Sequence, residues 1–164
     1  MLKKLLDPKE CAACRICCTF DDEDLWETPV VYNNQVTGVR EQTNAEFIDR
    51  GEYKLFSLDK SDDGIYYCTA LDKSSGCKLS SELKPFDCKI WPFRVMRIKG
   101  FDRTVITLSP VCPVVKTRPL ADIMNVVSEI SDEIFEQAAA HPYMVKDYIE
   151  GYPILAVENT IRNS

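Results

Sequence analysis

The sequence has 164 residues, of which 45% are hydrophobic and 28% charged, a balance typical of a soluble globular protein with one domain over residues 1–164. Its 20 Lys and Arg against 26 Asp and Glu give a formal net charge of −6, which argues against nucleic acid and anionic membranes as partners. No stretch approaches the roughly 18 apolar residues of a membrane span and the first ten residues lack a secretory signal core, so we expect a cytoplasmic protein.

The middle of the chain carries the patterns of three β-hairpins. In the first, the segments 29–32 and 35–39 flank Asn33-Asn34, two residues that tolerate the left-handed geometry of a tight turn. In the other two, apolar and polar residues alternate on either side of a polar turn, over residues 53–58 with 65–69 and residues 93–98 with 104–108. These patterns predict a small, mostly antiparallel sheet, preceded by a short irregular segment over residues 8–18.

After the last hairpin the apolar period changes from two to between three and four residues. This pattern over residues 120–138 predicts an amphipathic helix that begins near Pro119 and ends before His141-Pro142. A shorter helix is expected over residues 142–150. The predicted fold class is therefore α+β: a small sheet of hairpins, a cysteine-rich metal-binding segment at the N-terminus, and a helical part over residues 118–151.

Cysteine is the residue type that indicates function. The chain has a single histidine and eight cysteines: Cys11, Cys14, Cys17, Cys18, Cys68, Cys77, Cys88 and Cys112. An even number can indicate disulfides, but in a reducing compartment clustered thiols bind metal more often. The first three cysteines form two overlapping CxxC motifs, a spacing that lets one turn present two sulfurs to one metal ion. Because adjacent side chains usually diverge, we expect Cys17 and Cys18 to point to different metal centres or to opposite edges of one polynuclear centre.

The other four cysteines are spread along the chain, and only the fold can bring them to the first group. Cys68 is expected on a strand, and the last three are expected near the ends of elements. The single histidine, His141, is expected to cap the long helix rather than to bind metal. Several basic residues close to the cysteines are expected to offset thiolate charge and to lower thiol pKa values; they are Arg15, Lys78, Lys84, Lys89 and Arg94.

The cysteine spacing resembles that of a known family. Its elements are Cys11-x-x-Cys14-x-x-Cys17-Cys18, Tyr67-Cys68-x-x-Leu71, Gly76-Cys77-x-Leu79, Lys84-Pro85-x-x-Cys88-Lys89-x-x-Pro92-Phe93 and Cys112. This pattern is similar to that of the CxxCxxCC family of zinc- or iron-chelating domains, over residues 11–113, about two-thirds of the chain. The resemblance implies that the eight cysteines chelate metal. Similar domains occur within flagellin lysine methylases, which adds an enzymatic alternative.

The sequence departs from the family pattern at four positions. Arg15 stands where glycine is usual after the second cysteine. Lys84 and Lys89 stand in place of arginines, and Trp91 replaces an aromatic residue that is usually phenylalanine. The last three changes keep charge and bulk, so Arg15 is the departure that bears on the turn around Cys14.

The thiol donor set fits two kinds of metal centre. Zinc accepts four thiolates in a tetrahedral site, so eight cysteines suit one or two zinc ions. The CxxCxxC spacing also suits three irons of a [4Fe–4S] cluster, and Cys112-Pro113 is similar to the Cys-Pro of bacterial ferredoxins, so iron or such a cluster is the alternative. We expect a cysteine-ligated metal-binding protein with a structural or metal-handling role. The alternative is an iron–sulfur enzyme or electron-transfer protein, including one related to methyl transfer, and either would be compatible with a protein partner.

Overall fold

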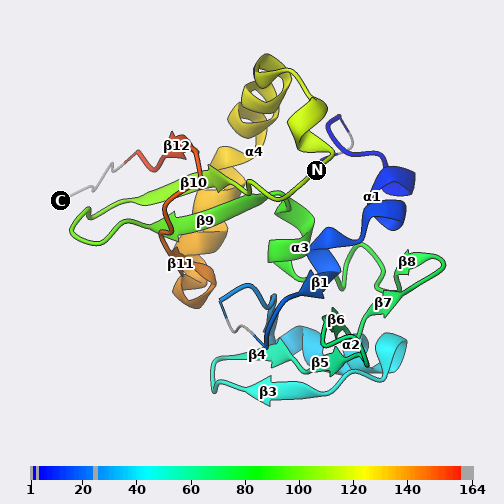
Figure 1. Cartoon of the computed structure of the whole chain (residues 1–164). Helices are drawn as coiled ribbons and strands as arrows, with labels where there is room; N and C mark the ends of the chain where they lie inside the picture. The colour runs from blue at the N-terminus through cyan, green and yellow to red at the C-terminus, as the bar shows by residue number, and fades with distance from the viewer. Residues whose placement is uncertain (1, 3, 24–25, 160–164) are drawn as a thin grey trace. The chain divides into compact units, whose positions relative to one another are not determined.

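The chain forms two compact units in a computed structural model that describes residues 2, 4–23 and 26–159 (Figure 1). Unit 2 is the continuous segment Leu6–Ile90, while unit 1 combines Met1–Leu5 with Trp91–Ser164. In the sequence, unit 2 is therefore inserted into unit 1. Both units contain helices and antiparallel strands, which confirms the predicted α+β class. This division differs from the expected parts, residues 11–113 and 118–151, and the single domain stays a prediction.

Unit 2 is built from short elements. They are α1 (Pro8–Cys14), η1 (Ile16–Cys18), β1 (Thr19–Phe20), β2 (Val30–Tyr32), η2 (Asn33–Gln35), α2 (Val36–Thr43), β3 (Phe47–Asp49), β4 (Tyr53–Phe56), β5 (Leu58–Lys60), β6 (Tyr66–Cys68), β7 (Leu71–Asp72), β8 (Gly76–Cys77) and α3 (Phe86–Ile90). The strands form three antiparallel sheets with the orders β1-β6-β5, β2-β4-β3 and β7-β8. The core consists of Phe20, Val31, Val39, Ala45, Phe56, Leu58, Cys68, Ala70 and Leu79.

The prediction of an irregular segment over residues 8–18 is wrong, because these residues form α1 and η1. Asp7 and Glu10 cap the start of α1. The Asp7 carboxylate accepts the Lys9 backbone N–H at 2.8 Å, and the Glu10 carboxylate accepts the Asp7 N–H at 3.4 Å. This reciprocal capping box satisfies donors that the first turn leaves unpaired. The first four cysteines are therefore presented by helical turns.

The first predicted hairpin is also wrong in its second half. Residues 33–43 form η2 and α2, and Val39 on α2 is fully buried in the core of unit 2. The left-handed geometry expected at Asn33-Asn34 instead occurs at Asn44, with φ 56°, where it ends α2. The burial of an apolar helix face outweighed the turn preference of the asparagines.

The second hairpin forms between different partners than predicted. Strand β5 pairs with β6 across a turn at residues 61–64, and Leu58 lies opposite Cys68. Strand β4 belongs to another sheet, between β2 and β3, a strand that the sequence pattern did not predict. Cys68 lies on a strand, as expected.

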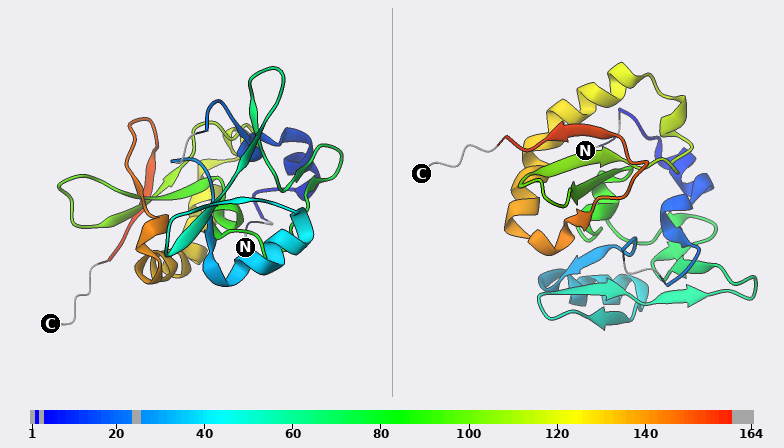
Figure 2. Two further views of the ribbon diagram at one scale, coloured as in Figure 1. Left: turned by 90° about the horizontal axis from the view of Figure 1, so that it is seen from below. Right: turned by 60° about the vertical axis from the view of Figure 1, so that its left-hand side comes forward.

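Unit 1 is a four-stranded sheet with one long helix against it (Figures 1 and 2). Its elements are β9 (Phe93–Arg97), β10 (Thr104–Leu108), η3 (Val115–Thr117), α4 (Leu120–Ala140), η4 (Pro142–Met144), β11 (Lys146–Asp147) and β12 (Ile154–Val157). The strand order is β11-β9-β10-β12, antiparallel except for the parallel pair β11 and β9. The third hairpin and the long helix are confirmed.

Both ends of unit 1 contribute to its packing. The side chain of Leu5 is buried, and the Leu5 carbonyl accepts a hydrogen bond of 3.0 Å from Arg118 Nε. On α4 the residues Ile123, Val127, Ile130 and Ile134 are buried at the helical spacing that the sequence shows. Every helix in the described residues is too short or too polar to span a lipid bilayer.

The short helix predicted over residues 142–150 is wrong. His141 ends α4, since its backbone N–H donates to the Gln137 carbonyl at 2.9 Å, which fits the expected capping role. Its ring Nδ1 lies 2.8 Å from the Tyr143 hydroxyl. Residues 142–144 then make one 3-10 turn, and Lys146 and Asp147 add a strand to the sheet beside β9, because edge pairing satisfies their backbone groups.

Candidate metal centre

The N-terminal cysteines lie on two consecutive helical turns, two on α1 and two on η1. Between the turns Arg15 adopts a left-handed conformation with φ 58°, at the position where the similar family usually has glycine. The Arg15 backbone N–H donates to the Cys11 carbonyl at 3.0 Å, and its Nε donates to the Ala12 carbonyl at 3.1 Å. The arginine thus ends α1 and is held in an unfavourable backbone conformation by its own side chain.

The thiols of Cys17 and Cys18 lie side by side, with their Sγ atoms 3.9 Å apart. This contradicts the expectation that the two adjacent side chains diverge toward different centres or opposite edges of one. The reason is the 3-10 turn η1, closed by the Cys18 N–H donating to the Arg15 carbonyl at 2.9 Å. Two adjacent sulfurs are therefore available on one side of the chain.

Strand pairing brings a third cysteine to this pair. Thr19 on β1 lies opposite Tyr67 on β6 in an antiparallel register, so Cys18 and Cys68 are the next opposed positions along the ladder. Cys68 is part of the core of unit 2, and Cys18 packs against that core. Cys18 and Cys68 are 50 residues apart in the sequence, and the pairing of β1 with β6 brings them together. No local motif indicates this pairing.

A fourth cysteine arrives on the short helix α3. Asp87, in the same turn as Cys88, is buried, and its Oδ2 accepts the Val30 backbone N–H at 3.1 Å. The Cys88 N–H donates to the Pro85 carbonyl at 3.0 Å. These contacts hold α3 to β2 and fix where Cys88 enters the unit.

The thiols of unit 2 raise one another's pKa values. The pKa of Cys18 is raised far above its ordinary value by the hydrogen bond with Cys17, by burial, and by the charges of Cys17, Cys68 and Cys88. Burial raises the pKa of Cys68 to about 12, with further contributions from Cys77 and Cys17. Burial and then the charges of Cys68, Cys17 and Cys77 raise the pKa of Cys88. Five thiols therefore lie within each other's electrostatic range.

The basic residues do not lower these thiol pKa values, contrary to the sequence-based expectation. The nearest of them bond to backbone carbonyls: Lys78 Nζ to Thr69 at 3.4 Å and Lys89 Nζ to Glu82 at 3.3 Å. Arg94 belongs to unit 1, where its guanidinium lies over the Trp91 ring, 5.1 Å from the centroid. Burial and the neighbouring thiols raise the pKa values of Cys18, Cys68 and Cys88, which favours their neutral form in the metal-free protein.

Helix α1 packs against the β7–β8 hairpin, which carries Cys77. A Cβ added to Gly76 would lie 3.2 Å from the Cβ of Ala12, so the backbone of β8 approaches α1 closely. Cys11 and Cys14 flank Ala12 on α1 and are half-buried, whereas Cys77 is exposed. The CxxC pair and Cys77 therefore belong to one region of unit 2.

Cys112 is the cysteine that unit 1 carries. It is 4% exposed and precedes η3. Among residues 2, 4–23 and 26–159, no three His, Cys, Asp or Glu side chains are already arranged as ligands of one metal ion. The side chains of unit 2 nevertheless suit a metal ion that prefers thiolate ligands, since five thiols and no imidazole share one region.

The sequence did not indicate two features of this region. Asp87 lies between Phe86 and Cys88, in a stretch where nothing distinguishes a buried structural carboxylate from a surface one. The contact of Gly76 with Ala12 was equally hidden, although a glycine directly before Cys77 was a signal for close backbone approach.

No protein-family model, no curated protein and no solved structure matches the chain. The resemblance to the CxxCxxCC family accordingly depends on the cysteine spacing alone.

Proposed function

We propose that the chain is a metal-binding protein that holds zinc with cysteine thiolates of unit 2. The observation that carries the proposal is the separation of 3.9 Å between the Sγ atoms of Cys17 and Cys18. With Zn–S bonds of about 2.3 Å, two ligands of a tetrahedral zinc stand about 3.8 Å apart. The pair thus has the spacing of one edge of a zinc–thiolate tetrahedron.

The remaining ligands are drawn from the thiols that interact electrostatically with this pair. Cys68 lies opposite Cys18 across the β1–β6 ladder, and Cys88 enters from α3. Together the four give the closed set of sulfurs that structural zinc sites use. Each cysteine has a single side-chain dihedral angle, so rotation about that angle is the adjustment that ion binding requires.

Cys77, Cys11 and Cys14 remain as additional donors in the neighbouring region of α1 and β8. They suit a second zinc ion or an entry point for the first, because they are more accessible than Cys68. Cys112 belongs to unit 1 and stays a predicted ligand from the sequence.

The chemistry that zinc supplies here is structural, since a four-thiolate site leaves no open position for substrate. The chain's own residues determine how tightly the ion is held. The buried thiols must lose their protons on binding, so each raised pKa weakens zinc affinity at neutral pH and makes it depend steeply on pH.

The experiment is a zinc titration of the metal-free, reduced protein with a competing colorimetric chelator, without oxygen. We expect tight binding in the wild type and a loss of at least about a hundredfold in affinity for Cys18→Ser and Cys88→Ser, because removing even a residue that only supports a ligand costs 10–100-fold. Ser81→Ala, an exposed position of unit 2 without a thiol, is the control and should bind zinc as the wild type does. Unchanged affinity in both Cys18→Ser and Cys88→Ser would refute the proposal.

One observation favours a second candidate, an iron–sulfur centre. Cys11, Cys14 and Cys17 lie on the consecutive turns α1 and η1, and their CxxCxxC spacing suits three irons of a [4Fe–4S] cluster. A cluster protein would have about four irons and matching sulfide, with absorption near 400 nm, when purified without oxygen. Colourless protein that contains zinc and no sulfide would exclude this candidate.

A further inference from the structure

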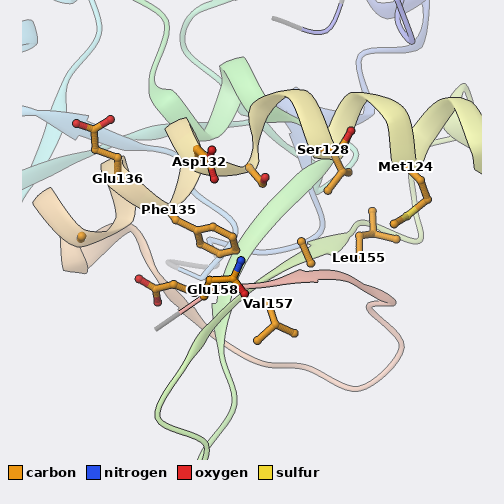
Figure 3. Close-up of a pocket in the computed structure, with 13 residues that line it drawn as sticks. Met124, Ser128, Asp132, Phe135, Glu136, Leu155, Val157 and Glu158 are labelled. Atoms are coloured by element: carbon orange, nitrogen blue, oxygen red, sulfur yellow. The ribbon is translucent and has the colours of Figure 1, made fainter. Parts of the chain in front are cut away.

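A groove in unit 1 lies between α4 and β12, far along the sequence from the cysteine motifs. It encloses about 490 Å³ and is lined by residues of α4 between Met124 and Ala139 and by β12 with the two residues after it. Figure 3 shows Phe135 projecting from α4 toward β12, with Leu155 and Val157 on the strand side. The groove therefore combines apolar side chains such as Phe135 and Leu155 with polar and charged ones.

The strand that forms one wall has an open edge. In the sheet β11-β9-β10-β12, the described residues give the last strand a hydrogen-bonded neighbour on one side only. All four residues of β12 are apolar, and Ile154 and Val157 remain 43% and 38% exposed. Edge strands are ordinarily protected by charged residues or proline within the strand, and β12 has neither. Such an edge pairs readily with another extended segment.

The backbone direction at this edge can be read from the neighbouring hydrogen bond. The Glu158 N–H donates to the Thr104 carbonyl of β10 at 2.9 Å. Because donors alternate between the two sides of a strand, the Val157 N–H points away from β10. The register shift in this pair lies between Ile106 and Thr107, so it does not affect the end at Val157. At this end of β12 an incoming strand would find the outward N–H and C=O of Val157, while the irregularity at Leu155 interrupts the row further along the strand.

The groove is charged with one sign. Three carboxylates line it, those of Asp132, Glu136 and Glu158, and none of the described lining residues is Lys, Arg or His. Glu158 also accepts the Thr104 N–H at 3.3 Å, and the ion pairs Lys4–Glu129 and Lys54–Asp49 involve none of the three. Asp132 and Glu136 are four residues apart on α4, a spacing at which like charges repel.

We propose that this groove binds an extended, lysine- or arginine-bearing segment of a partner protein, which adds a strand beside β12 and places its basic side chains against Asp132, Glu136 and Glu158. The open backbone edge supplies the main-chain pairing, Phe135 and Leu155 contact the alternate side chains, and the carboxylates select the charge. A second copy of this chain is a poor occupant, because it would bring the same carboxylates to a groove that already carries three.

The test uses fluorescent six-residue peptides and the full-length protein. One peptide alternates lysine with valine, and the matched peptide alternates glutamate with valine; binding is followed by fluorescence anisotropy at two salt concentrations. The lysine peptide should bind saturably, at least about tenfold tighter than the glutamate peptide, and should weaken with salt. Equal binding of the two peptides, or none, would overturn the proposal.

Charge variants on α4 locate the binding site without disturbing the core. The double variant Asp132→Asn with Glu136→Gln should weaken the lysine peptide about threefold to tenfold. Glu133→Gln, an exposed carboxylate on the same helix outside the groove, is the control and should leave affinity unchanged. An equal effect of the double variant and the control would show that the peptide responds to overall charge and would overturn the assignment.

A backbone variant tests the pairing mode. Val157→Pro removes an N–H that points away from β10, so the sheet should survive while peptide affinity falls at least about tenfold. If this variant does not fold, the charge variants decide alone. Sedimentation of the wild type over a range of concentrations tests whether a second copy of this chain pairs with β12 instead. A dimer that Val157→Pro abolishes would assign the edge to that second copy and overturn the proposal.

Discussion

The clearest test of how unit 2 is held together is the removal of the Asp87 carboxylate. Asp87 is 4% exposed, and its Oδ2 accepts the Val30 N–H at 3.1 Å, which joins α3 to β2. A hydrogen bond to a charged group contributes about 1.5–3 kcal/mol, and a buried N–H left without an acceptor costs about 1–3 kcal/mol. Since these contributions overlap, Asp87→Ala should lower the free energy of unfolding by about 2–4 kcal/mol, and Asp87→Asn, which keeps a neutral acceptor, by about half as much.

The assay is urea unfolding of the metal-free protein at pH 7, followed by circular dichroism and analysed by linear extrapolation. Asp62→Ala removes an exposed carboxylate from a turn of the same unit and serves as the control, with an expected change within about 0.5 kcal/mol. A loss for Asp87→Ala no larger than that of the control would refute the reasoning. It would mean that the bond to Val30 does not hold α3, and that Cys88 is positioned by other contacts.

Three further predictions concern local features of unit 2. Because the pKa of Cys68 rises from 9.0 to about 12 on folding, the metal-free protein should be most stable below pH 9, and this thiol alone should cost up to about 4 kcal/mol between pH 9 and 12. Cys68→Ser should therefore make the slope of alkaline urea titrations shallower without removing it, since the pKa values of Cys18 and Cys88 are raised as well. The free energy of unfolding should be about 1 kcal/mol higher for Arg15→Gly than for Arg15→Ala, since both variants lack the guanidinium and only glycine adopts φ 58° without strain. Equal stability of the two variants would contradict backbone strain at this residue. Gly76→Ala should lower the melting temperature more than Gly64→Ala, because both have positive φ but only Gly76 has a neighbour, 3.2 Å from the added Cβ; equal melting would argue against close packing of α1 on β8.

Periodic segments of the chain were predictable because burial and sequence pattern agree there. Helix α4 buries residues at the spacing of its apolar positions, and β9 and β10 pair across the turn that the sequence marks. Where the sequence pattern and the burial of apolar side chains favoured different structures, burial determined the structure that forms. Residues 35–39 have the composition of a strand but form part of a helix, since Val39 fills the core of unit 2.

For the cysteines, the sequence indicated which residues matter but not how they meet. That Cys68 sits on a strand followed from its alternating neighbours, yet its partner β1 has only two residues and offers no pattern to detect. The contact of Cys17 with Cys18 depends on a 3-10 turn that follows Arg15. Arg15 has a left-handed backbone conformation, which residues other than glycine rarely adopt. Long-range pairing and strained turns are set by the whole fold, so local rules could not predict them.

The insertion of unit 2 between two pieces of unit 1 fixes an order of events during synthesis. Leu6–Ile90 is complete once Ile90 has left the ribosome, whereas Leu5 must wait for Arg118 and α4, which come much later in the chain. At about 5–20 residues per second, translation of Trp91–Ser164 takes about 4 to 15 s. Small domains fold faster than that. The cysteine-bearing unit therefore has time to form, and to meet its metal, while the buried N-terminal leucines of unit 1 are still exposed to chaperones and proteases.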